Sequence, residues 1–471
     1  MPSIRVRALN DTPIRADGRY ILYWMVAQRR LAWNYALDHA IAVGRNLGRP
    51  IVVLEGLRTG YRWASDRVHR FVLEGMEDNA RAAREAGLTY YPYVEPEHGH
   101  GRGLLAALSE HACCVVTDYY PCFFLPRMIA AAAAKLPVRL EAVDGNGLLP
   151  LHTVERDFTT AYSFRRHLHK TLPDHLGAFP QASPLAGYNG GFAPIDPAIS
   201  KRWTPCRDPR GVELSALPID HGIPPVPATG GSEAGRERLR AFMDRDLESY
   251  GERYSGLSPY LHFGHVGAHE VFGTLAELQN WGPELIAPKP TGQRHGWWNF
   301  TEAGESFVDE LVTWRELGFV FAHRHPETYA TYESLPGWAR KTLEDHATDP
   351  RPHVYDLETL ARAETHDEIW NAAQRQLLEQ GVIHSQVRML WGKKVFEWSR
   401  TPREALERLI ELNNRYAIDG RDPNSYSGIC WVLGRFDRAW GPERPIYGKI
   451  RFMTSERMLK KVPSLRDWMR G

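Results

Sequence analysis

The sequence has few of the features that mark secreted, membrane-spanning or metal-binding proteins. Only five of its 471 residues are cysteines, and their spacing fits neither a disulfide framework nor a metal motif: Cys113, Cys114, Cys122, Cys206 and Cys430. No apolar run reaches the roughly 18–20 residues that a membrane-spanning helix needs, and the N-terminus has no apolar signal segment. These absences predict a reduced, cytoplasmic protein with no membrane partner.

A large charge of one sign is also missing. The 58 basic and 57 acidic side chains nearly cancel, which excludes a uniformly cationic, histone-like protein but leaves room for a local basic groove. The 43% apolar and 24% charged residues are typical of a globular chain. Tryptophan, by contrast, is abundant, with 15 residues beside 20 tyrosines and 17 phenylalanines. This supply of indoles is the compositional feature that most needs an explanation.

Short apolar runs alternate with helical patterns in the N-terminal third of the chain. The strand-like runs are residues 20–25, 51–54, 88–94, 114–117 and 138–143. Helical periodicity follows the first run at about 30–46 and the second at about 66–86. Strands separated by helices of this length predict a parallel sheet with helices on both faces. We therefore expect a Rossmann-like α/β domain over residues 1–153.

The composition changes in the next segment. Ten prolines fall between Phe179 and Pro227, where periodic apolar positions are scarce. Residues 154–232 are therefore predicted to form a Pro-rich interdomain linker. Helical periodicity returns in segments 236–250, 268–280, 307–323, 367–380 and 402–414. We expect an all-α domain over residues 233–471.

Two candidate motifs are weak. The loop 98–103 (His-Gly-His-Gly-Arg-Gly) matches neither GxGxxG nor a P-loop, so a flexible βα loop is a better interpretation than a phosphate cradle. His262, His265 and His269 have helical spacing suited to a metal, but no HExxH or matching carboxylate motif accompanies them. We predict no metal site, and a metal-dependent hydrolase is kept as an alternative function.

Three other places suit a bound phosphate or aromatic group. Ser255 to Ser258 precede a predicted helix, where free N–H groups and hydroxyls can hold phosphate oxygens. Glu310 and Trp314 are four residues apart, on one face of a predicted helix. This pair could bind a planar polar ligand, or it could belong to an ordinary amphipathic helix. The acidic loop 419–424 fits an ordinary turn or contact with the polar edge of a cofactor.

Three tryptophans lie on two predicted helices. Trp391 and Trp398 are seven residues apart, on one face of a helix, and Trp370 lies on the helix before it. Core packing is the default explanation for aromatics at such positions. A chain for electron hopping is the sharper alternative, because indoles can be oxidised transiently.

Several strings, in order along nearly the whole chain, match one family. They are 20–25 (YILYWM), 257–264 (LSPYLHFG), 334–339 (SLPGWA), 365–367 (THD), 370–374 (WNAAQ), 419–424 (DGRDPN) and 447–451 (YGKIR). With them the chain resembles the class II cyclobutane pyrimidine dimer photolyases of the photolyase/cryptochrome superfamily. The resemblance implies an N-terminal α/β domain and an all-α C-terminal domain that binds FAD, active as FADH⁻.

The resemblance also implies which residues hold the cofactor. They are Tyr254, Ser255, Gly256, Leu257, Ser258, Arg388, Asn413, Asp419, Asp422 and Asn424. The segment from Ser255 to Ser258 would hold the FAD phosphates, and either Asn413 or Asn424 would face flavin N5. In this family the N-terminal domain can hold a second, antenna chromophore, often a deazaflavin.

The implied reaction is light-driven repair of UV-damaged DNA, in which excited FADH⁻ gives one electron to a flipped-out pyrimidine dimer. The dimer would lie against Glu310, Trp314, Tyr355, Met389 and Trp431. Glu310 would act catalytically by favouring the reduced dimer. The electron chain would run through Trp391 (proximal), Trp370 (intermediate) and Trp398 (distal). The side chains that grip phosphates would be Arg435, Arg438, Lys449 and Arg451.

The sequence departs from the family pattern at several positions. Ser385 and Gln386 stand where a glycine and an aromatic are expected, and Asn414 stands where aspartate is expected. The segment 247–258 is shorter, and 315–320 is more apolar. A cryptochrome-like photoreceptor without repair activity is therefore the alternative, although the chain ends soon after the last family string, without a long output tail. We expect a monomer.

Overall fold

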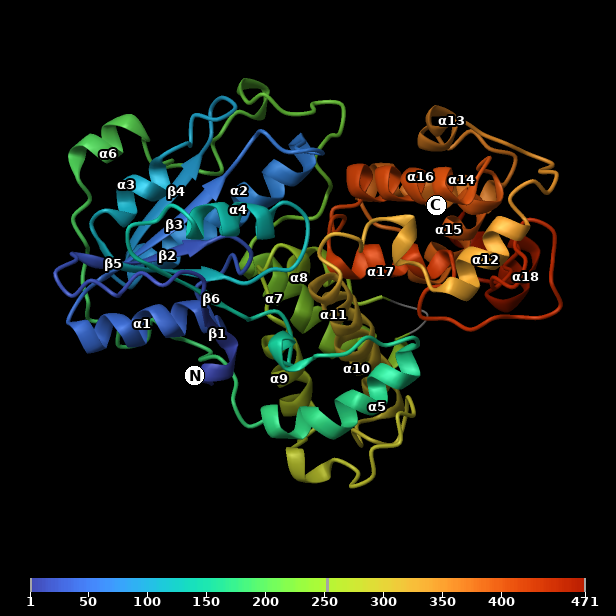
Figure 1. The fold of residues 1–471 in the computed structure, drawn as a ribbon, viewed down its shortest axis with the longest axis horizontal. Coiled ribbons are helices and arrows are strands. Elements are labelled where there is room, and N and C mark those ends of the chain that lie inside the picture. The colour runs from blue at the N-terminus through green and yellow to red at the C-terminus, as the bar shows by residue number, and fades with distance from the viewer. Residues whose placement is uncertain (1, 251–253, 470–471) are drawn as a thin grey trace.

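A six-stranded sheet forms the N-terminal lobe, and helices make up most of the rest of the chain (Figure 1). The computed structural model describes residues 2–250 and 254–469. The strands are β1 (Val6–Ala8), β2 (Tyr20–Met25), β3 (Ile51–Leu57), β4 (Thr89–Val94), β5 (Ala112–Asp118) and β6 (Arg139–Val143). Their order is β1-β6-β5-β2-β3-β4, and all neighbours are parallel except β1 and β6. The predicted parallel sheet is confirmed, with an additional antiparallel edge strand.

Both faces of this sheet are covered by helices. On one face lie α1 (Tyr35–Leu47) and the C-terminal part of α2 (Asp66–Glu85), whose Ala83 belongs to the same apolar cluster as α1. On the other face lie α3 (Leu104–Ser109) and α4 (Leu125–Ala133). In β2, Tyr23 packs with the α1 side, whereas Leu22 and Trp24 pack with the other side. Alternate residues of a strand point to opposite faces, so a strand as uniformly apolar as β2 requires cover on both.

The predicted linker is partly helical. The helix α5 (Ala161–Thr171) begins with a capping box in which Thr160 and Ser163 exchange hydrogen bonds. Phe164 and Leu168 are buried, and α5 packs on the segment 309–314 of the helical part. Residues 154–232, predicted as a Pro-rich linker, therefore include a packed helix that precedes the Pro-rich stretch 179–227. Farther along, the Pro-rich chain contains α6 (Pro197–Arg202) and is tied to the N-terminal lobe, for example where Cys206 N–H donates to the Pro92 carbonyl (2.8 Å).

Thirteen further described helices form the C-terminal part. They are α7 (Ser232–Ala241), α8 (Ser258–His262), α9 (Ala268–Leu278), α10 (Glu302–Val308), α11 (Arg315–Arg324), α12 (Gly337–Asp345), α13 (Leu357–Ala361), α14 (Glu368–Gln380), α15 (Ser385–Glu397), α16 (Pro402–Tyr416), α17 (Pro423–Val432), α18 (Ser455–Lys461) and α19 (Leu465–Trp468). Two expected helices are interrupted by π-helical turns, at Phe242–Asp246 and Asp309–Trp314. No described helix is both long enough and apolar enough to cross a membrane.

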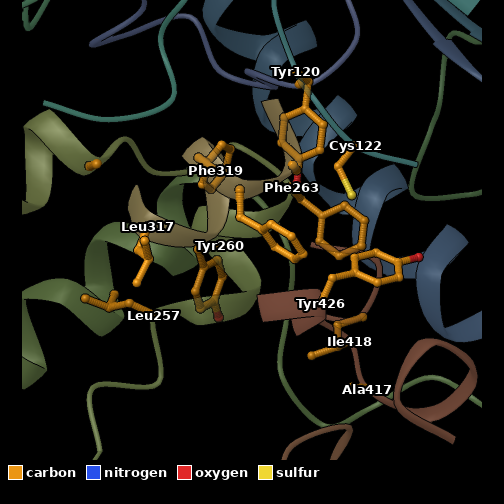
Figure 2. Packing of buried hydrophobic residues seen from close by; sticks show 14 of the residues in the cluster. Tyr120, Cys122, Leu257, Tyr260, Phe263, Leu317, Phe319, Ala417, Ile418 and Tyr426 are labelled. Carbon is orange, nitrogen blue, oxygen red and sulfur yellow. The ribbon is translucent and has the colours of Figure 1, made fainter. Parts of the chain in front are cut away.

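The N-terminal lobe and the helical part share one apolar core. Figure 2 shows Tyr120 and Cys122 of the lobe packed near Phe263, Phe319 and Tyr426 of the helical part. Tyr120 meets the ring of Phe319 edge-on, with centroids 5.6 Å apart. This shared core fixes the position of α11 and α17 relative to the sheet.

The unusual apolar segment 315–320 belongs to this interface. Gly318 lets α11 approach α17 closely, because a Cβ at this position would lie 2.8 Å from the Cα of Asn424. Glu316 is buried, and its carboxyl accepts the backbone N–H groups of Leu148 (2.7 Å) and Leu149 (3.0 Å). Burial raises the pKa of Glu316 to about 7 despite these two hydrogen bonds. The departure from the family pattern therefore serves packing.

Candidate functional site

A cavity of about 1030 Å³ lies in the helical part. Most of the predicted site residues line it: Tyr254, Ser255, Gly256, Ser258, Glu310, Trp314, Arg388, Met389, Trp391, Asn413, Asp419, Asp422, Asn424 and Trp431. Leu257 does not, because its side chain is only 1% exposed in the apolar core. The cavity thus gathers side chains from α8, the π turn 309–314, α15, α16 and α17.

An arginine shapes the turn before α8. Arg238 donates hydrogen bonds to the carbonyls of Ser255 (2.6 Å) and Tyr254 (3.1 Å). Gly256 has a φ of 67°, and a Cβ there would lie 2.8 Å from Arg238 Nε, so the turn favours glycine. Residues 251–253, which belong to the segment that is shorter than the family pattern, lie outside the described residues. The turn brings small side chains and backbone groups to the cavity wall.

Asp422 connects the cavity to the N-terminal lobe. One of its oxygens caps α17 by accepting the Asn424 N–H (2.8 Å), and the other accepts the Tyr120 hydroxyl (3.0 Å) and lies 3.2 Å from His262 Nδ1. Burial alone would raise the pKa of Asp422, but the hydrogen bond with His262 and nearby positive charge lower it below its usual value. Asp422 is therefore a carboxylate at neutral pH.

Asp419 has an acceptor that the protein leaves open. Its Oδ2 lies 3.7 Å from Arg388 Nη1, while its Oδ1 is buried without a hydrogen-bond partner in the described chain. Buried acceptors normally have a donor, so a polar ligand with an N–H or O–H group fits here. Asn413 and Asn424 line the same cavity.

Asn414, one of the departures from the family pattern, has a structural contact set. It is fully buried, accepts the backbone N–H of Arg421 (2.8 Å) and donates to the Tyr426 hydroxyl (3.0 Å). An amide can accept and donate at once, which a carboxylate cannot. Asn414 therefore holds the 419–422 loop in place, while its neighbour Asn413 faces the cavity.

The three tryptophans form a continuous series that starts at the cavity. Trp391 lines the cavity, and its ring is parallel to that of Trp370, with centroids 6.2 Å apart. Trp370 meets Trp398 edge-on at 5.5 Å. The indole N–H groups of Trp391 and Trp370 donate to Gln374 Oε1 and to the Trp391 carbonyl, each at 3.0 Å. Close, ordered rings of this kind are suited to stepwise electron transfer.

Tyr355 lies at the far end of that series, not in the cavity. Its ring meets Trp398 edge-on at 5.4 Å, and its hydroxyl is 2.7 Å from Nδ1 of the exposed His366. Its N–H donates to the Trp398 carbonyl (3.3 Å), beyond the C-terminal end of α15. The prediction that Tyr355 lines the lesion pocket is therefore wrong, because this tyrosine packs against Trp398 and is not among the residues that line the cavity.

The π turn 309–314 carries two cavity residues, Glu310 and Trp314. Its other acid, Asp309, is held by Arg165 of α5 through two hydrogen bonds of 2.7 and 3.0 Å. Glu310 is exposed to solvent within the open cavity. Desolvation by the surrounding protein, with the charge of Asp309 as a smaller cause, still raises its pKa to about 7. Near neutral pH its carboxyl can therefore donate a hydrogen bond.

The four predicted phosphate contacts fall into two groups. Arg438 and Arg451 line the cavity. Arg435 donates to the Ser334 carbonyl and stacks over Phe321, and Lys449 pairs with Glu443 outside the cavity. A neighbouring hollow of about 500 Å³ is lined by four basic side chains: Arg444, Arg451, Arg457 and Lys461. It shares Trp431 and Arg451 with the cavity, so a cationic surface adjoins the cavity.

The chain is similar over most of its length to proteins named deoxyribodipyrimidine photo-lyase. The protein from Methanothermobacter thermautotrophicus is 32% identical over 99% of this chain and 98% of its own. The chain belongs to the deoxyribodipyrimidine photo-lyase family. Further photo-lyases of this name are 31% identical in Arabidopsis thaliana (92% of this chain, 85% of that one) and 30% identical in Potorous tridactylus (95% and 81%). No protein-family model matches the chain.

Solved photolyase and cryptochrome structures have the same fold as this photo-lyase family member. A class III photolyase from Agrobacterium tumefaciens has a TM-score of 0.68 at 17% identity, over 96% of this chain and 86% of that one. A cryptochrome from Synechocystis sp. PCC6803 has a TM-score of 0.67 at 12% identity, over 96% and 88%. These likenesses establish the fold, an α/β lobe followed by a helical part, and the photo-lyase relatives establish an enzyme.

A second hollow, of about 480 Å³, lies in the N-terminal lobe of this photo-lyase family member. Its aromatic wall includes Trp24, Tyr61, Tyr93, Phe123 and Phe124. Its cations are Arg29, Arg58, Arg102, Lys135 and Arg421. The glycine-rich loop forms one side, but Glu95 Oε1 accepts the N–H groups of Gly99 (3.0 Å) and Gly101 (3.1 Å). With these amides occupied, the loop is not a phosphate cradle.

The three spaced histidines make separate contacts. His262 binds Asp422, His265 accepts the Gly231 N–H (2.9 Å), and His269 packs between Tyr35 and Phe179. Burial lowers the pKa of His265 to about 3. No group of three or more potential metal ligands occurs within residues 2–250 and 254–469.

Sequence patterns missed the contribution of α5 and of the loop before α10. Tyr162 and Arg165 of α5, with Arg294, line the cavity. Tyr162 is 54% exposed, so an aromatic ring borders the entrance. The Thr160 capping box was a local signal for this helix, but the prediction of one linker over residues 154–232 left the helix out.

Proposed function

We propose that this enzyme repairs DNA by splitting cyclobutane pyrimidine dimers with light, as a class II member of its family. The observation that carries the proposal is a single cavity that combines polar groups for a flavin, an acid and two indoles for a lesion, and the first ring of a tryptophan series. No one of these features is specific. Their convergence on one cavity is what favours repair.

FAD fits the polar groups of the cavity. The segment from Tyr254 to Ser258 would hold its phosphates, and Arg388, Asn413, Asp419, Asp422 and Asn424 would surround the isoalloxazine. The open Oδ1 of Asp419 is suited to a flavin ring N–H. When bound and reduced, the flavin would supply the photoexcited electron that opens the dimer.

The lesion side of the cavity would hold a dimer flipped out of UV-damaged DNA. Trp314 and Trp431 would provide aromatic surfaces and Met389 an adaptable apolar contact. Glu310 would donate a hydrogen bond to a pyrimidine carbonyl, where negative charge develops. Arg438, Arg451 and the adjoining basic hollow would bind the flanking phosphates.

The tryptophan series would keep the flavin reduced. Trp391 would give an electron to the light-excited oxidised flavin, and the hole would move through Trp370 to Trp398. Its parallel and edge-on contacts support this order. Repair by an enzyme that is already reduced would not need the series.

The hollow in the N-terminal lobe suits a flat aromatic anion, because aromatic walls and several cations surround it. A deazaflavin antenna has this chemistry and is our proposal for the occupant. We also propose an intracellular monomer. Five free cysteines, four of them buried, are compatible with a reducing compartment.

The test begins with the absorption spectrum of the purified protein, followed by repair. Chemically reduced protein is illuminated with blue light in the presence of DNA that contains thymine dimers, and the remaining dimers are counted. We expect loss of dimers in the light only. A reduced flavoprotein that leaves dimers intact would refute repair and favour the cryptochrome-like alternative.

The tryptophan series is tested with Trp391→Phe. This variant should fail to photoreduce oxidised flavin but should repair at the wild-type rate when reduced beforehand. The matched control is Trp281→Phe, because Trp281 lies in an aromatic cluster with Trp298 and Phe300 and does not line the cavity. If reduced Trp391→Phe also lost repair, the residue would have a function beyond electron supply.

A further inference from the structure

Lys393 is a buried lysine with no function in the proposed reaction as described so far. It lies on α15, two residues after Trp391, and its side chain is 0% exposed. None of the ion pairs among the described residues involves it. An unpaired charge is costly to bury, so its retention at this position calls for a reason.

The ammonium lies next to the aromatic wall of the cavity. Lys393 Nζ donates to the Val432 carbonyl (2.6 Å) and lies 4.9 Å from the ring centroid of Trp431. The Arg451 guanidinium carbon lies 5.3 Å from the same ring. Both distances are in the range of cation–π attraction, and Trp431 lines the cavity. Two cations therefore adjoin one cavity indole.

The surrounding groups leave the Lys393 charge uncompensated. The carboxylate whose charge acts on it, Asp437, is bound by Arg451 through hydrogen bonds of 2.9 and 3.1 Å. The Tyr447 hydroxyl lies within hydrogen-bond distance of the Lys393 carbonyl (3.1 Å) and of a Glu397 carboxylate oxygen (3.0 Å), and as a neutral group it gives the ammonium no compensating charge. Burial, partly offset by Asp437 and reinforced by Arg451, lowers the pKa of Lys393 to about 7.

The adjacent lysine shows the contrasting arrangement. Lys394 Nζ lies 3.1 Å from Glu397 and 3.8 Å from Asp367, near Trp398 at the far end of the tryptophan series. Two carboxylates thus neutralise Lys394. Lys393 and Lys394 differ by one position, and only Lys393 directs an unpaired charge toward the cavity wall.

We propose that Lys393 is a positioning residue that holds Trp431 in place and keeps a positive charge behind the wall against which a pyrimidine dimer becomes negatively charged. This inference rests on the proposed repair function. A fixed charge placed before the reaction stabilises a developing anion without reorganisation. The buried charge would lower the free energy of unfolding of the protein, and in return it would speed electron transfer to the dimer.

The test uses the flavin-loaded enzyme, reduced beforehand, with Lys393→Gln and Lys393→Met. Glutamine keeps a donor for the Val432 carbonyl but removes the charge, and methionine removes both. A unit charge that acts over roughly 10 Å at an effective dielectric constant of about 20 changes the equilibrium for forming the reduced, negatively charged dimer by about tenfold. At pH 6, below the pKa of about 7 at which Lys393 loses its proton, we expect both variants to repair about tenfold more slowly per absorbed photon, with binding of undamaged DNA unchanged.

Thermal unfolding separates an electrostatic function from a structural one. Removing an unpaired buried charge should leave the melting temperature of Lys393→Met unchanged or raise it by about 2 °C. The matched control, Lys394→Met, should repair within about twofold of wild type and melt lower, because it leaves Glu397 and Asp367 without their cation.

Three outcomes overturn the inference. Wild-type repair by Lys393→Gln would exclude a need for the charge. Joint loss of repair and of melting temperature in both variants, or failure of both to fold, would make Lys393 a structural residue. A wild-type enzyme that binds flavin but leaves dimers intact would refute the proposed function and this inference together, whereas an unaffected Lys393→Gln in a repairing enzyme would refute this inference alone.

Discussion

The protonation of Glu310 gives the sharpest prediction for the proposed reaction. This side chain is exposed within the open cavity, and desolvation by the surrounding protein, with the charge of Asp309 as a smaller cause, raises its pKa from 4.5 to about 7. The neutral carboxyl can donate a hydrogen bond to a pyrimidine carbonyl, whereas the carboxylate would repel the negative charge that forms there. Repair should therefore fall as the pH rises through 7.

The size of the effect follows from the pKa. With a pKa of about 7, Glu310 is about nine-tenths neutral at pH 6 and about one-tenth neutral at pH 8. If only the neutral form supports repair, the rate per absorbed photon should drop about tenfold across this range. Glu310→Gln, which imitates the neutral acid, should repair at a rate that changes much less with pH.

The assay follows dimer loss under blue light with enzyme reduced beforehand, at several pH values and saturating DNA. Lys393 also loses its proton near pH 7 and would act in the same direction, so a residual slope in Glu310→Gln should disappear when Lys393→Gln is added. A pH profile of Glu310→Gln identical to that of wild type would refute the reasoning. Equal DNA binding at pH 6 and pH 8 is the necessary control.

Three further predictions concern the electron path and the interface between the two parts. Trp370→Phe should block photoreduction as Trp391→Phe does, because Trp370 touches both other indoles at 6.2 and 5.5 Å; transient absorption of the flavin measures this. Glu316→Gln should lower the free energy of unfolding by about 1–3 kcal/mol, because one of the two N–H groups that Glu316 accepts loses its partner; urea unfolding measures this. Gly318→Ala should lower the free energy of unfolding by about 1–3 kcal/mol, because the new Cβ would clash with the Asn424 backbone. The control Gly337→Ala should leave it nearly unchanged, because a Cβ there meets open space.

Local sequence patterns were sufficient for the sheet. Each parallel strand is a short apolar run between helical segments. A strand that helices cover on both faces of the sheet needs apolar residues at nearly every position. The tryptophan spacing on α15 likewise put Trp391 and Trp398 on one face. The antiparallel strand β1 was not indicated, because three residues at a sheet edge, partly exposed, have no distinctive period.

Patterns failed where long-range contacts decide the geometry. Tyr355 was expected in the lesion pocket, but α15 places it beside Trp398 at the opposite end of the tryptophan series. Helix α5 lies within the predicted linker, before its Pro-rich stretch, and is held by Asp309 through Arg165. The π turn 309–314 shifts its side chains out of the 3.6-residue register on which helix prediction depends.

The sequence by itself determined the fold class, the order of its parts and the family strings, because these depend on local periodicity and residue identity. The tertiary structure decided which of these residues meet around the cavity, how the indoles are ordered, and that Lys393 is buried without a carboxylate while Lys394 has two. Burial and charge pairing arise from neighbours distant in the chain. The pKa values of Glu310 and Lys393 therefore exist only in the folded protein.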